Sequence, residues 1–205
     1  MGDITQYNVA LFLHVSVVIV GFMIAAVLHV GLNVMVRSKT VEEAHSWGRV
    51  VHRLEPLLPV SALLILVFGA WLIGASHKVW HWGDGWILTA VIALIVIEGL
   101  AGALLAPHSK KLVAAIEEAG NGPMSPALRS QAMDPVIWDL AHVATFGFLG
   151  VVFVMTNKPS GVGAVIVVVI GAIVGVALSR WQLALAAKAT GTAASAAGAS
   201  SPATP

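Results

Sequence analysis

Long apolar stretches alternate with short polar ones along most of the chain. A helix needs roughly 20 mainly apolar residues to cross about 30 Å of hydrocarbon, and five stretches meet this requirement. They run over residues 9–36, 57–75, 86–106, 136–156 and 162–178. The pattern predicts an all-α membrane protein, a bundle of five transmembrane helices with a four-helix core plus one. Residues 1–188 are expected to form this single transmembrane domain.

The polar segments between the spans carry signals for shorter elements. Residues 40–43 read Thr-Val-Glu-Glu, a capping-box pattern that satisfies free backbone N–H groups at a helix start, and they predict a helix over residues 41–54. The third loop continues through residues 107–118 and reaches a Gly-Asn-Gly-Pro break at 120–123. We expect this loop to be a docking surface. Residues 189–205 are almost wholly Ala, Gly, Ser, Thr and Pro, which predicts a disordered tail.

Composition narrows the function classes. Hydrophobic residues make up 58% of the chain and charged residues only 10%, whereas soluble domains carry about 25% charged residues. The net charge is +1 and there is no basic stripe, so nucleic acid is not expected as a partner. The absence of cysteine excludes disulfides, thiolate metal sites and thiol catalysis. Without a hydrolase or nucleotide-binding motif, any chemistry must come from histidine, carboxylate or a bound cofactor.

The distribution of lysine and arginine predicts the orientation, because positively charged short loops stay in the cytoplasm. Nine of these residues flank the inner ends of the spans: Arg37, Lys39, Arg49, Arg53, Lys110, Lys111, Arg129, Arg180 and Lys188. Only Lys78 and Lys158 lie on the other side. We therefore expect the N-terminus outside and the C-terminus in the cytoplasm.

Glycine pairs within the spans predict close helix packing. Gly171 and Gly175 form a GxxxG pair in the fifth span, which lets two helix backbones approach closely in a bilayer. Packing inside the bundle is favoured over a homo-oligomer formed through this pair. Four further glycines are interpreted in the same way, namely Gly99, Gly102, Gly147 and Gly150.

Four ionisable residues lie at membrane depth, where each costs a few kcal/mol unless it is paired, hydrated or bound. They are His14 and His29 in the first span, Glu98 in the third and His142 in the fourth. With a rise of about 1.5 Å per residue, His29, Glu98 and His142 share a layer roughly 9 to 12 Å from the inner surface. His14 lies in the outer half.

Several uses of this layer remain open. His29 and His142 on different helices suit a b-type haem, whose iron takes one imidazole from each face, and His14 is a weaker candidate ligand. The same pair with Glu98 suits a divalent transition metal. A desolvated Glu98 exchanging protons with neutral imidazoles would make a proton relay. The remaining alternative is hydrogen bonding between helices, to neighbours such as Asn33, with no ligand.

A set of short motifs occurs in a characteristic order over about residues 7–159. The motifs are Leu13-His14, Gly21, a basic stretch, a Pro- and Leu-rich entry to the second span that ends in Gly69 and Gly74, Trp86, and Asn157-Lys158-Pro159. In this order they resemble a family of bacterial integral membrane proteins of unknown function, distantly similar to copper-resistance protein D type membrane proteins. The resemblance implies a small helical bundle in the bacterial cytoplasmic membrane and singles out His14 as a matched position.

Three functions follow from these observations. The first expectation is an accessory or structural subunit of a larger bacterial membrane complex, with lipid and protein partners and no catalysis of its own. One alternative is a b-type haem electron-transfer protein with His29 and His142 as axial ligands, in which redox activity depends on the haem. The other is a proton- or metal-coupled transporter centred on Glu98.

Overall fold

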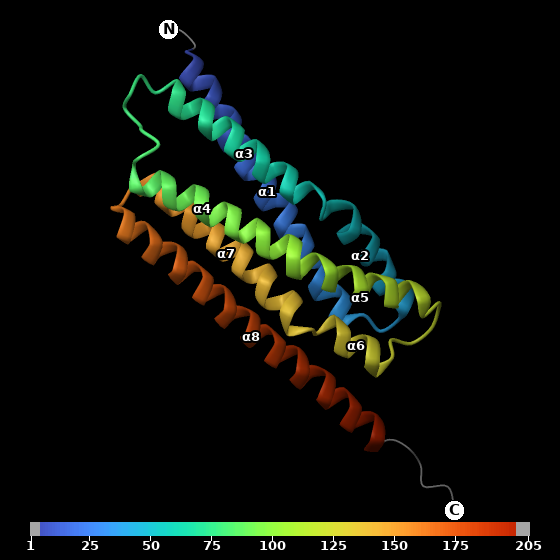
Figure 1. Cartoon of the computed structure of the whole chain (residues 1–205). Coiled ribbons are helices and arrows are strands. Elements are labelled where there is room, and N and C mark those ends of the chain that lie inside the picture. The colour runs from blue at the N-terminus through green and yellow to red at the C-terminus, as the bar shows by residue number, and fades with distance from the viewer. Residues whose placement is uncertain (1–4, 200–205) are drawn as a thin grey trace, which may run out of the picture.

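A computed structural model describes residues 5–199 of the chain and the side chains of residues 5–188. Within these residues the fold is all-helical and contains no strand (Figure 1). The elements in chain order are α1 (Gln6–Arg37), α2 (Val41–Leu54), α3 (Leu57–Gly74), α4 (Gly85–Leu100), the π-helix η1 (Ala101–Leu105), α5 (Ala106–Glu118), α6 (Pro126–Ala132), α7 (Pro135–Asn157) and α8 (Gly161–Ala199).

Five helical segments are long and apolar enough to cross a membrane. They are Gln6–Arg37, Val41–Gly74, Gly85–Glu118, Pro126–Asn157 and Gly161–Lys188. The start of α1 and the end of α8 lie at opposite ends of the bundle (Figure 1), as an odd number of spans requires. The predicted bundle of five apolar helices is therefore confirmed, and the side of the membrane that each terminus faces stays a prediction.

The helix predicted from the capping box begins and ends where expected, since α2 covers Val41–Leu54. The Thr40 side chain accepts a hydrogen bond from the Glu43 backbone N–H at 3.4 Å. The Glu43 carboxylate accepts from the N–H of Lys39, not of Thr40, so the reciprocal bond is shifted by one residue. The predicted break is also present, because Gly120 and Gly122 have φ values of 70° and 124°, which glycine adopts most easily.

The third span differs from the prediction, which ended it at residue 106. Instead, α4 passes through η1 into α5 along one continuous rod (Figure 1). Pro107 has no backbone N–H, and its ring clashes with the carbonyl four residues earlier in a regular α-helix. A single wider turn of π-helix relieves this conflict and lets the rod continue.

The fifth span also continues beyond its predicted end at residue 178. Ser179 and Arg180 both bind the carboxylate of Asp139 on α7, so these polar residues hold α8 against α7 and do not end it. Alanine, the strongest helix former, is frequent in the following residues. Because α8 ends at Ala199, it includes residues 189–199 of the segment predicted to be disordered. Residues 200–205 of that segment lie outside the described residues.

The spans form two groups. In one, α1 packs along α3; in the other, α7 packs along α8 and α4 (Figure 1). We call them the α1–α3 pair and the α4–α7–α8 group. Fewer contacts join the two groups than hold each together.

Glycines account for the close approach of α7 and α8. A Cβ atom at Gly175 would lie 2.6 Å from the carbonyl oxygen of His142, and one at Gly171 would overlap the carbonyl oxygen of Phe146. The packing interpretation is therefore confirmed for the GxxxG pair, and a homo-oligomer through it would have to displace α7. Gly147 and Gly150 also face neighbouring helices.

The packing interpretation is wrong for Gly99 and Gly102. A Cβ atom at either position would have no neighbour within 4 Å. These two glycines leave open space around the end of α4 and the start of η1.

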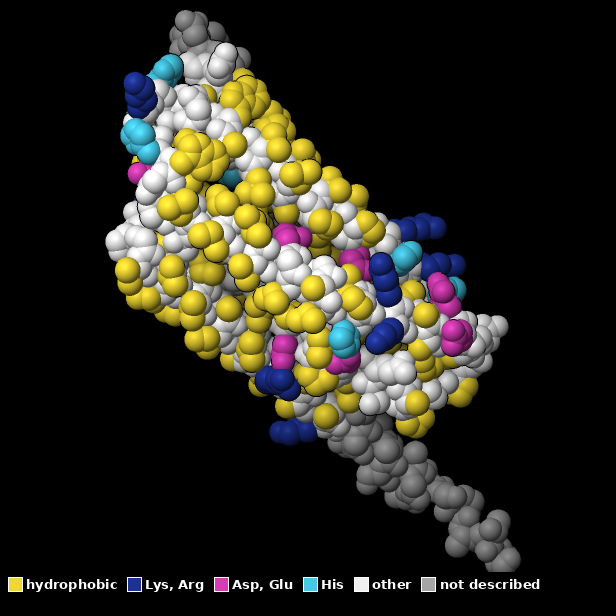
Figure 2. All heavy atoms as spheres, viewed as in Figure 1, with side chains coloured by type: hydrophobic (Ala, Val, Ile, Leu, Met, Phe, Trp, Pro, Cys, Tyr) yellow, Lys and Arg dark blue, Asp and Glu magenta, His cyan; other side chains and the backbone are white. Residues whose placement is uncertain are grey.

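The largest buried cluster lies at the end of the bundle that carries α2, α5 and α6, which we call the basic end. Charged side chains gather at this end, whereas the middle of the visible face is mainly hydrophobic (Figure 2). The cluster, here named the basic-end core, comprises Leu32, Met35, Val36, Val41, Ala44, Val51, Leu112, Ile116, Met124, Leu128, Ala132, Ile137, Trp138 and Ala141. Apolar residues of the predicted docking loop are therefore buried here, and docking by its exposed residues stays a prediction.

Candidate functional site

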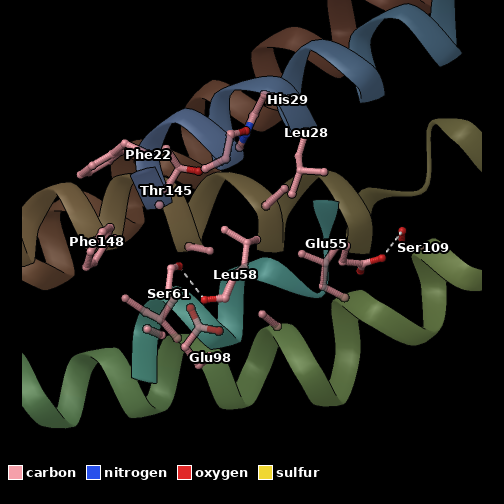
Figure 3. A pocket seen from close by; sticks show the side chains of 18 of the residues that line it. Phe22, Leu28, His29, Glu55, Leu58, Ser61, Glu98, Ser109, Thr145 and Phe148 are labelled. Carbon is pink, nitrogen blue, oxygen red and sulfur yellow. Dashed lines mark hydrogen bonds between the residues drawn. The ribbon is translucent and has the colours of Figure 1, made fainter. Parts of the chain in front are cut away.

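A cavity of about 100 Å³ lies between α1, α3, α4 and α7 and extends towards α2 and α5 at the basic end. Most of its lining is apolar. Its polar lining residues are His29, Glu55, Ser61, Glu98, Ser109 and Thr145 (Figure 3). Among the described residues that line it there is no lysine or arginine. The cavity separates the α1–α3 pair from α4 and α7, and α8 contributes nothing to its wall.

Glu98 is the carboxylate among the four ionisable residues that are predicted to lie at membrane depth. It lies on α4 and is half-buried, and its side chain points from α4 into the cavity (Figure 3). Within the described part of the chain no hydrogen bond or ion pair satisfies it. The π-helix begins three residues later, and such irregular turns frequently occur at functional sites. An unpaired carboxylate at this depth is a functional-site candidate by default.

His29 lines the cavity from α1, opposite Glu98 (Figure 3). Its Nδ1–H donates to the carbonyl oxygen of Ala25 at 2.9 Å, so the neutral ring carries its free lone pair on Nε2. That Nε2 atom is buried and has no hydrogen-bond partner in the described structure. A buried polar atom without a partner costs about 1–3 kcal/mol and calls for water, an ion or a ligand.

His142 on α7 is the neighbour of His29, a contact that their shared depth alone did not predict. The two ring centroids are 4.7 Å apart with an interplanar angle of 78°. His142 is 2% exposed and donates its Nδ1–H to the carbonyl oxygen of Trp138 at 2.8 Å. The rings of Trp138 and Phe146 stack on it. The structure thus brings the two predicted histidines into direct contact.

This contact does not fit haem ligation by the pair. A b-type haem needs one imidazole on each face of a flat macrocycle, with the iron between them. The edge of one ring here touches the face of the other, which leaves no space for a porphyrin. Haem binding by His29 and His142 would require the rings to separate, and it stays a prediction that this arrangement does not support.

A transition-metal site with Glu98 as third ligand is not assembled either. His142 does not line the cavity that His29 and Glu98 share. Across the described residues, no three histidine or acidic side chains lie close enough together to hold a metal ion. The predicted layer therefore contains two separate features. One is the contact between the rings of His29 and His142, and the other is the cavity that Glu98 lines.

His14 has a separate role in the outer half of the bundle. Its Nδ1–H donates to the carbonyl oxygen of Ile65 on α3 at 3.0 Å. A Cβ atom at Gly69 would lie 3.2 Å from the ring, so the imidazole packs closely on that helix. His14 connects α1 to α3, which matches the alternative of hydrogen bonding between helices. Asn33, in contrast, donates to the His29 carbonyl of its own helix.

Sequence reasoning missed Glu55 and Ser109 as cavity residues. Glu55 follows α2 and is half-buried, and Ser109 on α5 donates its hydroxyl hydrogen to the Glu55 carboxylate at 3.4 Å. The available signal was a carboxylate directly before Pro56 at the entry to a span. Nothing in the local pattern relates it to a serine 54 positions later.

Comparisons with known proteins do not identify the function of the site. No protein-family model, curated protein or solved structure matches the chain. The resemblance to bacterial membrane proteins distantly similar to the copper-resistance protein D type stays a prediction. The basis for a functional proposal is therefore the cavity and its ionisable side chains.

Proposed function

We propose that this protein moves an ion across the membrane, as a proton- or cation-coupled transporter whose coupling site is the cavity around Glu98. The observation that carries the proposal is an unpaired carboxylate at membrane depth that faces a cavity between two helix groups. Ionisable residues in spans are rare, face the bundle interior and mark ion pathways. Glu98 meets each of these conditions.

The placement of the cavity supports the same function. Transporters commonly bind their ion near the bilayer midplane, between parts of the molecule that move against each other. Here the cavity lies between the α1–α3 pair and the α4–α7–α8 group. Fewer contacts join these two groups to each other than hold each group together. The irregular turn η1 begins three residues after Glu98. A small movement of α4 would therefore change access to the carboxylate.

The proposal is tested by ion flux in proteoliposomes that contain the full-length protein. Proton flux is followed with an entrapped pH-sensitive dye, and Na⁺ and K⁺ fluxes with radioisotopes. We expect at least one ion to cross faster than in protein-free liposomes, and Glu98→Gln to abolish that flux because it keeps the shape and removes the charge. Glu118→Gln is the matched control, since Glu118 is exposed on α5.

Two results would count against the proposal. Flux of all three ions equal to that of protein-free liposomes would remove ion transport. Flux that survives Glu98→Gln unchanged would remove Glu98 as its centre.

The accessory-subunit role stays a prediction beside this proposal. It rests on the absence of catalytic motifs and on glycine-lined helix faces, of which Gly99 and Gly102 have no neighbour within 4 Å of an added Cβ atom. Stable co-purification with a larger complex from native membrane would support it, whereas a monodisperse preparation without partners would count against it. The five apolar helices support a multi-pass membrane protein, and its location in a bacterial cytoplasmic membrane is part of the proposal.

A further inference from the structure

We infer that the transported ion is a proton, and that it enters the cavity from the basic end through Glu55, which Ser109 positions. This inference rests on the proposed function of the cavity. It adds the chemical identity of the ion and the residue at which it enters.

The cavity wall suits a proton better than a divalent metal cation. Ca²⁺ takes about 6–8 oxygen ligands and Mg²⁺ requires near-octahedral coordination. Besides Glu98, four lining residues carry side-chain oxygens, namely Glu55, Ser61, Ser109 and Thr145. Of these, Ser109 donates to Glu55, and Ser61 donates to the Leu58 carbonyl at 2.7 Å. A proton needs only one carboxylate and a hydrogen-bonded route to it.

The cavity provides such a route between two carboxylates. Glu98 and Ser109 lie on the same α4–η1–α5 rod, and a rise of about 1.5 Å per residue places them roughly 16 Å apart along its axis. Both residues line the same cavity, as does Glu55. Hydrogen-bonded oxygens lie about 2.8 Å apart, so on the order of five waters would bridge this length.

The volume of the cavity agrees with that number. A water needs about 10–15 Å³ of cavity volume, and the cavity measures about 100 Å³. Apolar cavities stay dry unless polar groups hold the water. The carboxylates of Glu55 and Glu98 and the hydroxyls of Ser61 and Thr145 are polar groups that line this route.

Glu55 occupies the mouth of this route at the basic end. It lies in the turn between α2 and α3, half-buried, with its carboxylate hydrogen-bonded to Ser109. The charged and titratable groups that act on it are His52 of α2 and Lys110 of α5. It therefore faces the charged end of the molecule on one side and the cavity on the other.

The route transfers protons only, and no group is oxidised or reduced. A hydronium ion at the basic end breaks one O–H bond and becomes water as an O–H bond forms on the Glu55 carboxylate. Glu55 then passes the proton to a cavity water, and each further step breaks one O–H bond and forms the next. The last O–H bond forms on the Glu98 carboxylate, and transport requires that this bond break again as the proton passes to water on the opposite side. One proton enters at Glu55 and one leaves from Glu98, and both carboxylates return to their starting state.

The test compares variants of the full-length protein in the same proteoliposomes, driven by a K⁺ diffusion potential. A positioned proton-transfer group contributes about 10²–10⁴-fold in rate. We expect Glu55→Gln to slow proton flux by about 100-fold, the lower end of that range. Glu55→Asp keeps a titratable carboxyl and should recover part of the rate, which a purely structural role of Glu55 would not predict. Glu118→Gln should equal the unchanged protein, and replacing Na⁺ by choline should have no effect.

The possible outcomes separate this inference from the proposed function. Na⁺ or K⁺ flux without proton flux would overturn the proton assignment and leave ion transport intact. Proton flux that Glu98→Gln abolishes but Glu55→Gln leaves unchanged would overturn entry through Glu55 alone. No flux of any ion would remove both. If Glu55→Gln does not fold, Ser109→Ala takes its place, and an unchanged proton rate in that variant would overturn positioning by Ser109.

Discussion

The basic-end core and the middle of the membrane are packed in different ways. At the basic end, residues of α1, α2, α5, α6 and α7 bury one another, and Met35, Ile116 and Trp138 are at most 2% exposed. In the middle, the buried apolar cluster consists of Ala62, Ile65 and Leu94, and it borders the cavity. The part of the bundle that contains Glu98 is thus the less densely filled one.

The difference follows from the solvent that each region faces. Amphipathic helices at the basic end gain stability by removing apolar side chains from water. Lipid tails are as apolar as leucine, so helices in the membrane gain little from burial and depend on close backbone contact and hydrogen bonds. The α7–α8 glycines and the bond from His14 to Ile65 supply these contacts. A cavity with ionisable groups can exist in the middle because the basic-end core and these helix contacts stabilise the fold around it.

The largest effect is expected at the basic-end core. Trp138 is buried and donates its Nε1–H to the Ala132 carbonyl at 2.9 Å. Trp138→Ala should lower the free energy of unfolding by about 3–5 kcal/mol, the usual cost of truncating a buried aromatic residue. The measurement is chemical unfolding in mild detergent, followed by circular dichroism.

The matched substitution in the membrane middle is Phe148→Ala. Phe148 is partly exposed, lines the cavity and contacts Phe22, so it has fewer partners to lose. We expect a loss of less than about half the Trp138 value, because the cost of truncation depends on how completely a side chain is packed. Equal losses for the two variants would break the comparison.

An intermediate effect is expected where α8 lies on α7. Gly171→Val would place a branched side chain against the Phe146 carbonyl, and overpacking costs about 1–3 kcal/mol or more. Gly99→Val is the control, because that position is open. Thermal unfolding in detergent should show a clear drop for Gly171→Val only. A similar drop for both would indicate that loss of glycine alone, and not the helix contact, matters.

The smallest effect is expected at the end opposite the basic end. The Nζ atom of Lys158 lies 4.9 Å from the Trp80 ring centroid and 5.8 Å from that of Trp86. Lys158→Ala removes this cation–π contact, which is worth about 0.5–1 kcal/mol at an exposed site. Lys78→Ala removes an exposed lysine from the same end and serves as the control in the same unfolding assay. A loss as large as that of Trp138→Ala would show that this end also stabilises the fold strongly.

Much of the candidate site was visible in the sequence, but its use was not. His29, Glu98 and His142 could be selected as ionisable residues at one depth, since hydropathy and helix rise are local properties. Whether they meet depends on how the helices are rotated. The structure pairs His29 with His142 and leaves Glu98 facing the cavity. The sequence left both a haem between the histidines and a relay at Glu98 open, and the ring contact and the cavity favour the relay.

The sequence by itself determined the five apolar spans, the start of α2 at its threonine cap and the break at Gly120 and Gly122. Each depends on residues within a few positions of one another. The tertiary structure decided the continuation of α8 past Ser179 and the cavity that joins Glu98 to Glu55. These depend on which helix faces approach each other, and in a bilayer that choice is made by backbone contacts and hydrogen bonds between distant residues, not by hydropathy.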